Sequence, residues 1–256
     1  MKRLLGLLLI VIIVVSAVLI LRARHQRNYT VQAANAWEEI KNDSTISSFD
    51  SFLRNFPKSE FADLAKQKRD SLNMEKEWRF TQGLNSLEGY LDFQQRFPNS
   101  PHSEEAEEII KALQMERDWE EAQEANTIEA YREFIAAYPG TPYTQRAESM
   151  IIDLEVGNIF SGDHSTLPEA ELVEADGSGI NTIQVENQTN YTLTIRYSGP
   201  QSKRLVLGPR SSDSVRLVNG RYRVTASVST SAVTSFAGNQ TLEGGTYSSV
   251  YYISDY

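Results

Sequence analysis

The sequence contains no cysteine and only three histidines, His25, His102 and His164, among its 256 residues. The lack of cysteine excludes disulfides, thiolate metal ligands, cysteine nucleophiles and an N-terminal lipid-modified cysteine. The scattered histidines offer little from which to build a metal site. The formal net charge is −9, which argues against nucleic-acid binding because such proteins need a basic stripe.

The sequence also lacks the common catalytic signatures. It has no G-x-x-x-x-G-K-[ST], H-E-x-x-H or G-x-S-x-G motif. Asp163, His164 and Ser165 are residue types of a catalytic triad, but adjacency in sequence does not produce triad geometry. We therefore expect no catalytic, cofactor-binding or metal-binding residues, no cofactor and no enzyme activity.

The negative charge lies mostly in one part of the chain. Residues 1–30 carry five basic residues and no acid, residues 31–160 carry 25 acids and 13 bases (net −12), and residues 161–256 carry nine acids and seven bases (net −2). The distribution divides the chain into a basic start, a strongly acidic middle and a nearly neutral end.

Residues 4–21 form an uncharged run that consists almost entirely of Leu, Ile and Val. A helix of that length would span about 27 Å, close to the roughly 30 Å hydrocarbon core of a bilayer. The run is longer than the apolar region of a signal peptide. The sequence therefore predicts an uncleaved transmembrane helix, with residues 1–27 as a membrane anchor with basic flanks.

The acidic middle contains three repeats with a period of 41 residues and no gaps. When the three copies are aligned, each has a tryptophan, a proline and an alanine at the same positions. These residues are Trp37, Trp78 and Trp119; Pro57, Pro98 and Pro139; and Ala65, Ala106 and Ala147. Each period predicts a long helix and a short amphipathic helix, the short one ending before the proline. One such hairpin cannot bury its apolar face alone, so we expect a stacked α-hairpin solenoid over residues 28–160, with a partial fourth repeat.

The third copy, Tyr131-x-x-Phe134-Ile135-x-x-Tyr138-Pro139 with Ala147 beyond it, resembles the helix-turn-helix unit of tetratricopeptide-like proteins of the bacterial cell envelope. The period of 41 residues is longer than the 34 residues typical of that repeat. The resemblance implies a groove that binds protein segments without chemistry. It also implies that the soluble part of a single-pass membrane protein lies in the periplasm or outside the cell.

Composition changes after the repeats. Residues 161–180 are rich in Gly, Ser and acids and predict a linker. Residues 181–256 then contain short alternating runs separated by turn signals such as Asn219-Gly220, which predict an antiparallel β-sandwich. The predicted fold is therefore multidomain, α then β: a transmembrane helix, an α-α hairpin solenoid and a C-terminal antiparallel β-sandwich.

Two further groups of residues have competing interpretations. The acidic run at residues 104–108 is interpreted as a solvated helix start, because it lacks the glycine and ligand spacing of a calcium loop. Four tyrosines lie close together near the C-terminus: Tyr247, Tyr251, Tyr252 and Tyr256. If their rings formed an exposed row, they would stack on sugar rings, but packing within the sheet is the simpler interpretation.

These features together predict a non-enzymatic, membrane-anchored envelope protein that binds other proteins through its helical repeats. The net charge of −12 on the solenoid favours a basic or amphipathic partner segment. The alternative function is carbohydrate or cell-wall binding by the β-sandwich, with the solenoid as a spacer; a solvent-exposed row of the C-terminal tyrosines would favour it. No nucleic-acid partner is expected.

Overall fold

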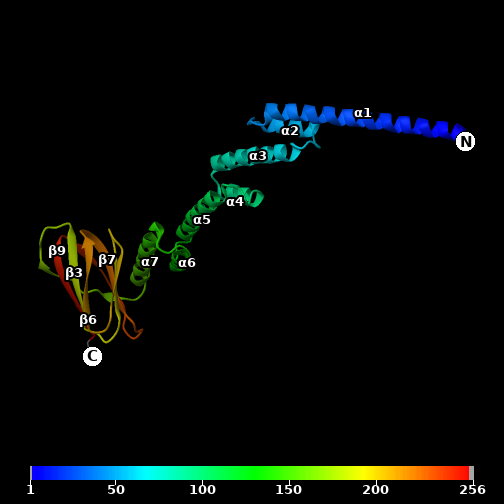
Figure 1. The fold of residues 1–256 in the computed structure, drawn as a ribbon. Coiled ribbons are helices and arrows are strands. Elements are labelled where there is room, and N and C mark those ends of the chain that lie inside the picture. Colours follow the sequence, from blue (N-terminus) through cyan, green and yellow to red (C-terminus); the bar gives the residue numbers. More distant parts are fainter. Residues whose placement is uncertain (1, 254–256) are drawn as a thin grey trace. The chain divides into compact units, whose positions relative to one another are not determined.

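The computed structural model describes the backbone of residues 2–253 and the side chains of residues 12–253. Helices come first and strands follow, as predicted (Figure 1). The chain divides into two compact units, residues 1–114 and 115–256. The first unit is entirely helical in its described part, and the second combines helices with two β-sheets.

The prediction of a membrane anchor is wrong for the part of the chain that the structure describes in full. Over residues 12–253, no helix is both long enough and apolar enough to cross a membrane. Residues 4–21 belong to one long helix, but the side chains of residues 4–11 lie outside the described set. The described remainder of the apolar run, residues 12–21, rises only about 15 Å, about half of a hydrocarbon core. The predictions of a signal anchor, of a single-pass membrane protein and of its periplasmic or extracellular placement are overturned with it.

Seven helices account for the N-terminal part of the described chain. They alternate between long and short members, as the period of 41 residues predicts. Their bounds are α1 (Lys2–Ile40), α2 (Ile46–Asn55), α3 (Ala62–Leu84), α4 (Leu87–Arg96), α5 (Ser103–Ala125), α6 (Ile128–Ala137) and α7 (Pro142–Ser161).

The same local interactions shape successive hairpins. α3 and α5 each end at an asparagine in the left-handed conformation, Asn85 and Asn126, a role that this residue tolerates better than most. Ser86 and Thr127 then cap the next short helix, because their side-chain oxygens accept hydrogen bonds from backbone N–H groups. The short helices end immediately before the aromatic-proline pairs, whose proline disfavours helical geometry in the preceding residue.

Each hairpin has its own aromatic core built around one tryptophan. Trp119, for example, packs its ring against Tyr131 and Phe134 of α6, with ring centroids 5.9 and 5.2 Å apart. Trp37 and Trp78 make the equivalent contacts in the first and second hairpins. The alanine column is fully buried in all three copies, at Ala65, Ala106 and Ala147.

The β part consists of two mixed sheets rather than the predicted antiparallel pair. The strands are β1 (Ser165–Thr166), β2 (Glu171–Glu174), β3 (Ile180–Asn187), β4 (Leu193–Ser198), β5 (Lys203–Leu207), β6 (Ser211–Val218), β7 (Gly220–Val228), β8 (Phe236–Leu242) and β9 (Gly245–Tyr251). One sheet has the order β1-β8-β7-β4-β5 and the other β2-β9-β3-β6. The β1–β8 and β3–β9 pairs are parallel, and this corrects the predicted sheet type.

The sheets enclose a core of alternating apolar side chains, which includes Ile183 and Val185 of β3 and Ile195 and Tyr197 of β4. Residues 161–180, predicted as a linker, contain β1 and β2. This segment also contributes the buried Leu167 to the core.

Helix α7 packs on the sheet that contains β4 and β5, and Glu155 of α7 joins it to both strands. The Glu155 carboxylate binds Arg196 of β4 and lies 2.8 Å from Nη2 of Arg204 on β5. The side chain of Glu155 is only 15% exposed. Burial raises the pKa of Glu155, but the hydrogen bonds and charges of the two arginines outweigh that effect and hold the pKa below its usual value.

Candidate functional site

The repeat positions singled out from the sequence differ in accessibility. The tryptophan column is almost inaccessible, with Trp37, Trp78 and Trp119 at 6, 4 and 7% exposure, and therefore offers no ladder of rings to a ligand. The prolines Pro57, Pro98 and Pro139 are exposed at the ends of the short helices. These columns position the helices, and a binding surface must come from residues between them.

The C-terminal tyrosines do not form one exposed row. Tyr247 is buried, Tyr251 is half-buried and Tyr252 is 69% exposed, while Tyr256 lies outside the described residues. Burial raises the pKa of Tyr251 to about 12. The arrangement that carbohydrate stacking would require is therefore missing from the described tyrosines.

The acidic run at the start of α5 is solvent-exposed. Glu107 and Glu108 of this run form ion pairs with Lys111 one turn later. Among residues with described side chains, no cluster of acidic or histidine side chains has an arrangement that could hold a metal ion. His164 and Ser165 are exposed, and Nδ1 of His164 lies 3.3 Å from the Ser165 backbone carbonyl oxygen.

One groove combines an acidic rim with an apolar floor, and it lies between α5 and α6. We call it the third-hairpin groove; it has a volume of about 350 Å³ and is lined by Asp118, Glu121, Ala122, Ala130, Glu133, Phe134, Ala137 and Tyr138. Three of these residues are carboxylates and five are alanines or aromatic residues. The groove is open because alanine side chains are small, and the three carboxylates lie along its border.

The carboxylate of Asp118 is fixed in place at the edge of the groove. Tyr138 donates a hydrogen bond of 2.6 Å to one oxygen, and Arg117 donates one of 2.8 Å to the other. These hydrogen bonds hold the pKa of Asp118 below its usual value, and the Asp118 carboxylate in turn raises the pKa of Tyr138. Asp118 therefore keeps its negative charge to a lower pH than an unpaired aspartate does.

Glu133 differs from Asp118 in its surroundings. In the described part of the chain, its carboxylate has neither a hydrogen bond nor an ion pair within the molecule, and it is solvent-exposed. A carboxylate retains about four lone-pair sites for donors. Together, Asp118 and Glu133 border the groove from two different helices and leave acceptor capacity toward it.

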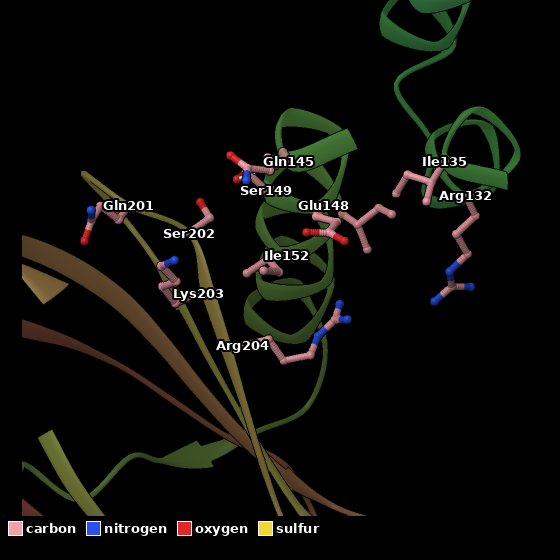
Figure 2. A pocket seen from close by; sticks show the side chains of 11 residues that line it. Arg132, Ile135, Gln145, Glu148, Ser149, Ile152, Gln201, Ser202, Lys203 and Arg204 are labelled. Atoms are coloured by element: carbon pink, nitrogen blue, oxygen red, sulfur yellow. Dashed lines mark hydrogen bonds between the residues drawn. The ribbon is translucent and has the colours of Figure 1, made fainter. Parts of the chain in front are cut away.

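A second cleft lies between the helices α6 and α7 and the start of β5. The α7–β5 cleft has a volume of about 750 Å³ and is lined by Arg132, Ile135, Gln145, Glu148, Ser149, Ile151, Ile152, Gln201, Ser202, Lys203 and Arg204. Figure 2 shows Gln201 to Arg204 on the strand side, opposite Gln145, Ser149 and Glu148 of α7. Its rim mixes both signs of charge, and Arg132 and Arg204 already lie near the Glu155 carboxylate. The charged residues that line the smaller third-hairpin groove, by contrast, are all acidic.

Comparison with known proteins adds no family to this description. No protein-family model, no curated protein and no solved structure matches the chain. The resemblance to tetratricopeptide-like proteins therefore stays a prediction from the repeat pattern.

The sequence located the repeat that carries the third-hairpin groove but did not identify its lining. Asp118, Glu121 and Glu133 are three among the 25 acids of residues 31–160. The available signal was Ala137, a small residue where the preceding copy has Arg96. A small side chain at this position leaves space between the helices, and the neighbouring larger side chains line that space.

Proposed function

We propose that this chain is a non-enzymatic protein-interaction protein, and that its helical repeats bind a basic, amphipathic segment of a partner. The observation that supports this most directly is the composition of the third-hairpin groove. Carboxylates of Asp118, Glu121 and Glu133 border a floor of alanine and aromatic side chains. Such a groove matches an amphipathic segment, whose apolar face contacts the floor while its cations meet the rim.

The charge of the surrounding helices supports the same choice of partner. Residues 31–160 carry a net charge of −12, which accelerates the approach of a cationic segment and makes binding sensitive to salt. A groove of about 350 Å³ accommodates a few side chains rather than a whole helix. We therefore expect modest affinity, in the micromolar range of about −8 kcal/mol.

The test is a fluorescence-anisotropy titration of the full-length protein with a labelled cationic amphipathic peptide of about twelve residues. The paired substitutions Glu121→Gln and Glu133→Gln should weaken binding by about tenfold. The paired substitutions Glu104→Gln and Glu105→Gln remove the same charge from the exposed start of α5 and should leave the dissociation constant within about threefold.

Equal losses in the two double variants would show that only overall charge matters and would contradict binding at the groove. Absence of peptide binding to the wild-type protein at low salt would contradict the proposed function itself.

A further inference from the structure

The three repeats differ at the positions that line the third-hairpin groove. A shift of 41 residues relates Asp118, Glu133, Ala137 and Tyr138 of the third hairpin to Glu77, Asp92, Arg96 and Phe97 of the second. Both hairpins thus have an acid on the long helix, an acid on the short helix and an aromatic ring before the proline. The difference lies in one column, where the second hairpin has an arginine and the third has an alanine.

Arg96 occupies the acidic site of the second hairpin from within the chain. Its Nη1 atom lies 3.0 Å from the Glu77 carboxylate on α3 and 3.1 Å from the Asp92 carboxylate on α4. Its guanidinium carbon also lies 5.3 Å from the centroid of the Phe97 ring, within the range of a cation–π contact. The hydrogen bonds to Asp92 and Glu77 raise the pKa of Arg96, so the guanidinium stays charged. The second hairpin is therefore an internal example of how this repeat binds a guanidinium.

The third hairpin keeps the two acids and the ring but has no arginine in the column of Arg96; its Asp118 pairs instead with Arg117, its neighbour on α5. Asp118 and Glu133 replace the two acids, and Tyr138 replaces the ring. Ala137 ends at its methyl group, and the space at this position is part of the cavity of about 350 Å³. Arg117 donates from both Nε and Nη2 to one oxygen of Asp118, and Tyr138 donates to the other, which leaves a lone pair available on the second oxygen.

The first hairpin shows that the acids are not required by the fold. Its residues in the same columns are Ala36, Ser51 and Asn55, which provide neither the acids nor the cation. The two acids and the arginine occur together in the second hairpin, and only the acids occur in the third.

We propose that the third-hairpin groove is a receptor for an arginine side chain of a partner segment. The partner's guanidinium contacts Asp118, Glu133 and Tyr138. In the second hairpin, Arg96 contacts the equivalent residues Glu77, Asp92 and Phe97. Arginine fits better than lysine because its planar, multiply donating group can bridge two carboxylates while lying on a ring. This inference rests on the proposed function, since it names the side chain by which the basic segment is recognised.

The test uses the full-length protein and the labelled peptide in three forms, with arginine, lysine or citrulline at its cationic positions. The arginine form should bind about fivefold or more tightly than the lysine form, and citrulline, which is neutral, should lose about tenfold or more. Ala137→Arg should place an arginine of the protein itself in the groove and weaken binding of the arginine peptide by about tenfold. Ala136→Arg adds the same charge at an exposed neighbouring position and serves as the control.

The reciprocal variant opens the second hairpin. Arg96→Ala removes the internal cation and should raise the peptide stoichiometry from one to two in isothermal titration calorimetry. This gain of a site keeps the inference testable if Ala137→Arg folds poorly.

The outcomes separate this inference from the function on which it rests. A wild-type protein that binds none of the peptides overturns both. Binding that depends on Glu121 and Glu133 but is equal for arginine and lysine, or equally weakened by the two arginine substitutions, overturns the arginine receptor and leaves the interaction function standing.

Discussion

Tyr138 of α6 donates a 2.6 Å hydrogen bond to the carboxylate of Asp118 on α5, and this contact joins the two helices that form the third-hairpin groove. The tyrosine belongs to the aromatic-proline pair that ends the short helix, and the aspartate lies beside Trp119 in sequence. A single hydrogen bond thus connects the repeat framework to the acidic rim.

Removing the tyrosine hydroxyl should cost stability. We expect Tyr138→Phe to lower the free energy of unfolding by about 1 kcal/mol, because the bond joins a neutral donor to a charged, partly exposed acceptor. Urea denaturation of the full-length protein measures the change. Tyr143→Phe removes a hydroxyl that makes no hydrogen bond in the described structure and should cost less; equal losses would show that the Asp118 contact contributes nothing.

The contribution of that hydrogen bond should depend on pH. The folded state lowers the pKa of Asp118 from its ordinary value of 3.8, so the associated stability is present above that value and is lost as the pH falls through the folded pKa. The stability gap between wild type and Tyr138→Phe should therefore shrink between about pH 5 and pH 2. A gap that stays constant or widens over that interval would contradict the assignment.

Glu155 should be a main contact between α7 and the sheet. Glu155→Gln should lower the free energy of unfolding of the 115–256 unit by about 2 kcal/mol, since it leaves Arg196 and Arg204 without their charged acceptor. Glu148→Gln, on an exposed position of the same helix, should change it by less than about 0.5 kcal/mol. Denaturant unfolding followed by circular dichroism compares the two variants.

The tryptophan column should be purely structural. Trp119→Ala should cost about 3–5 kcal/mol because it empties a position that is only 7% exposed in the aromatic core. Phe80→Ala, at a helical position that is 63% exposed, should stay within about 0.5 kcal/mol of wild type. Similar melting temperatures for both variants would show that Trp119 is not a core residue.

The helical repeats could be predicted from the sequence because their signals are local and recur. The tryptophan and alanine columns mark buried positions, and the Asn-Thr and aromatic-proline pairs mark helix boundaries. One half-buried column was not recognised from the sequence: Phe61, His102 and Tyr143 each stack on the tryptophan of their hairpin. Phenylalanine, histidine and tyrosine differ in polarity, so the sequence does not reveal that the three positions are equivalent. What they share is a flat ring that stacks on the tryptophan.

The sheet arrangement and the site depended on contacts that local patterns do not encode. Alternation in residues 181–256 identifies strands, but it does not reveal that β3 pairs in parallel with β9, about sixty residues later. Glu155 contacts Arg196 and Arg204, which follow it by 41 and 49 residues in the sequence. The membrane anchor failed for a different reason: the apolar run was judged by its full length, and its described part is too short to span a bilayer.

The most direct test of the arginine receptor is a nuclear Overhauser measurement on full-length protein with labelled alanine methyl groups and bound arginine peptide. The account predicts cross-peaks from the arginine side-chain methylenes to the methyl groups of Ala130 and Ala137, both of which line the groove. Saturating binding with cross-peaks only to alanines outside the groove, such as Ala112 or Ala232, would contradict it.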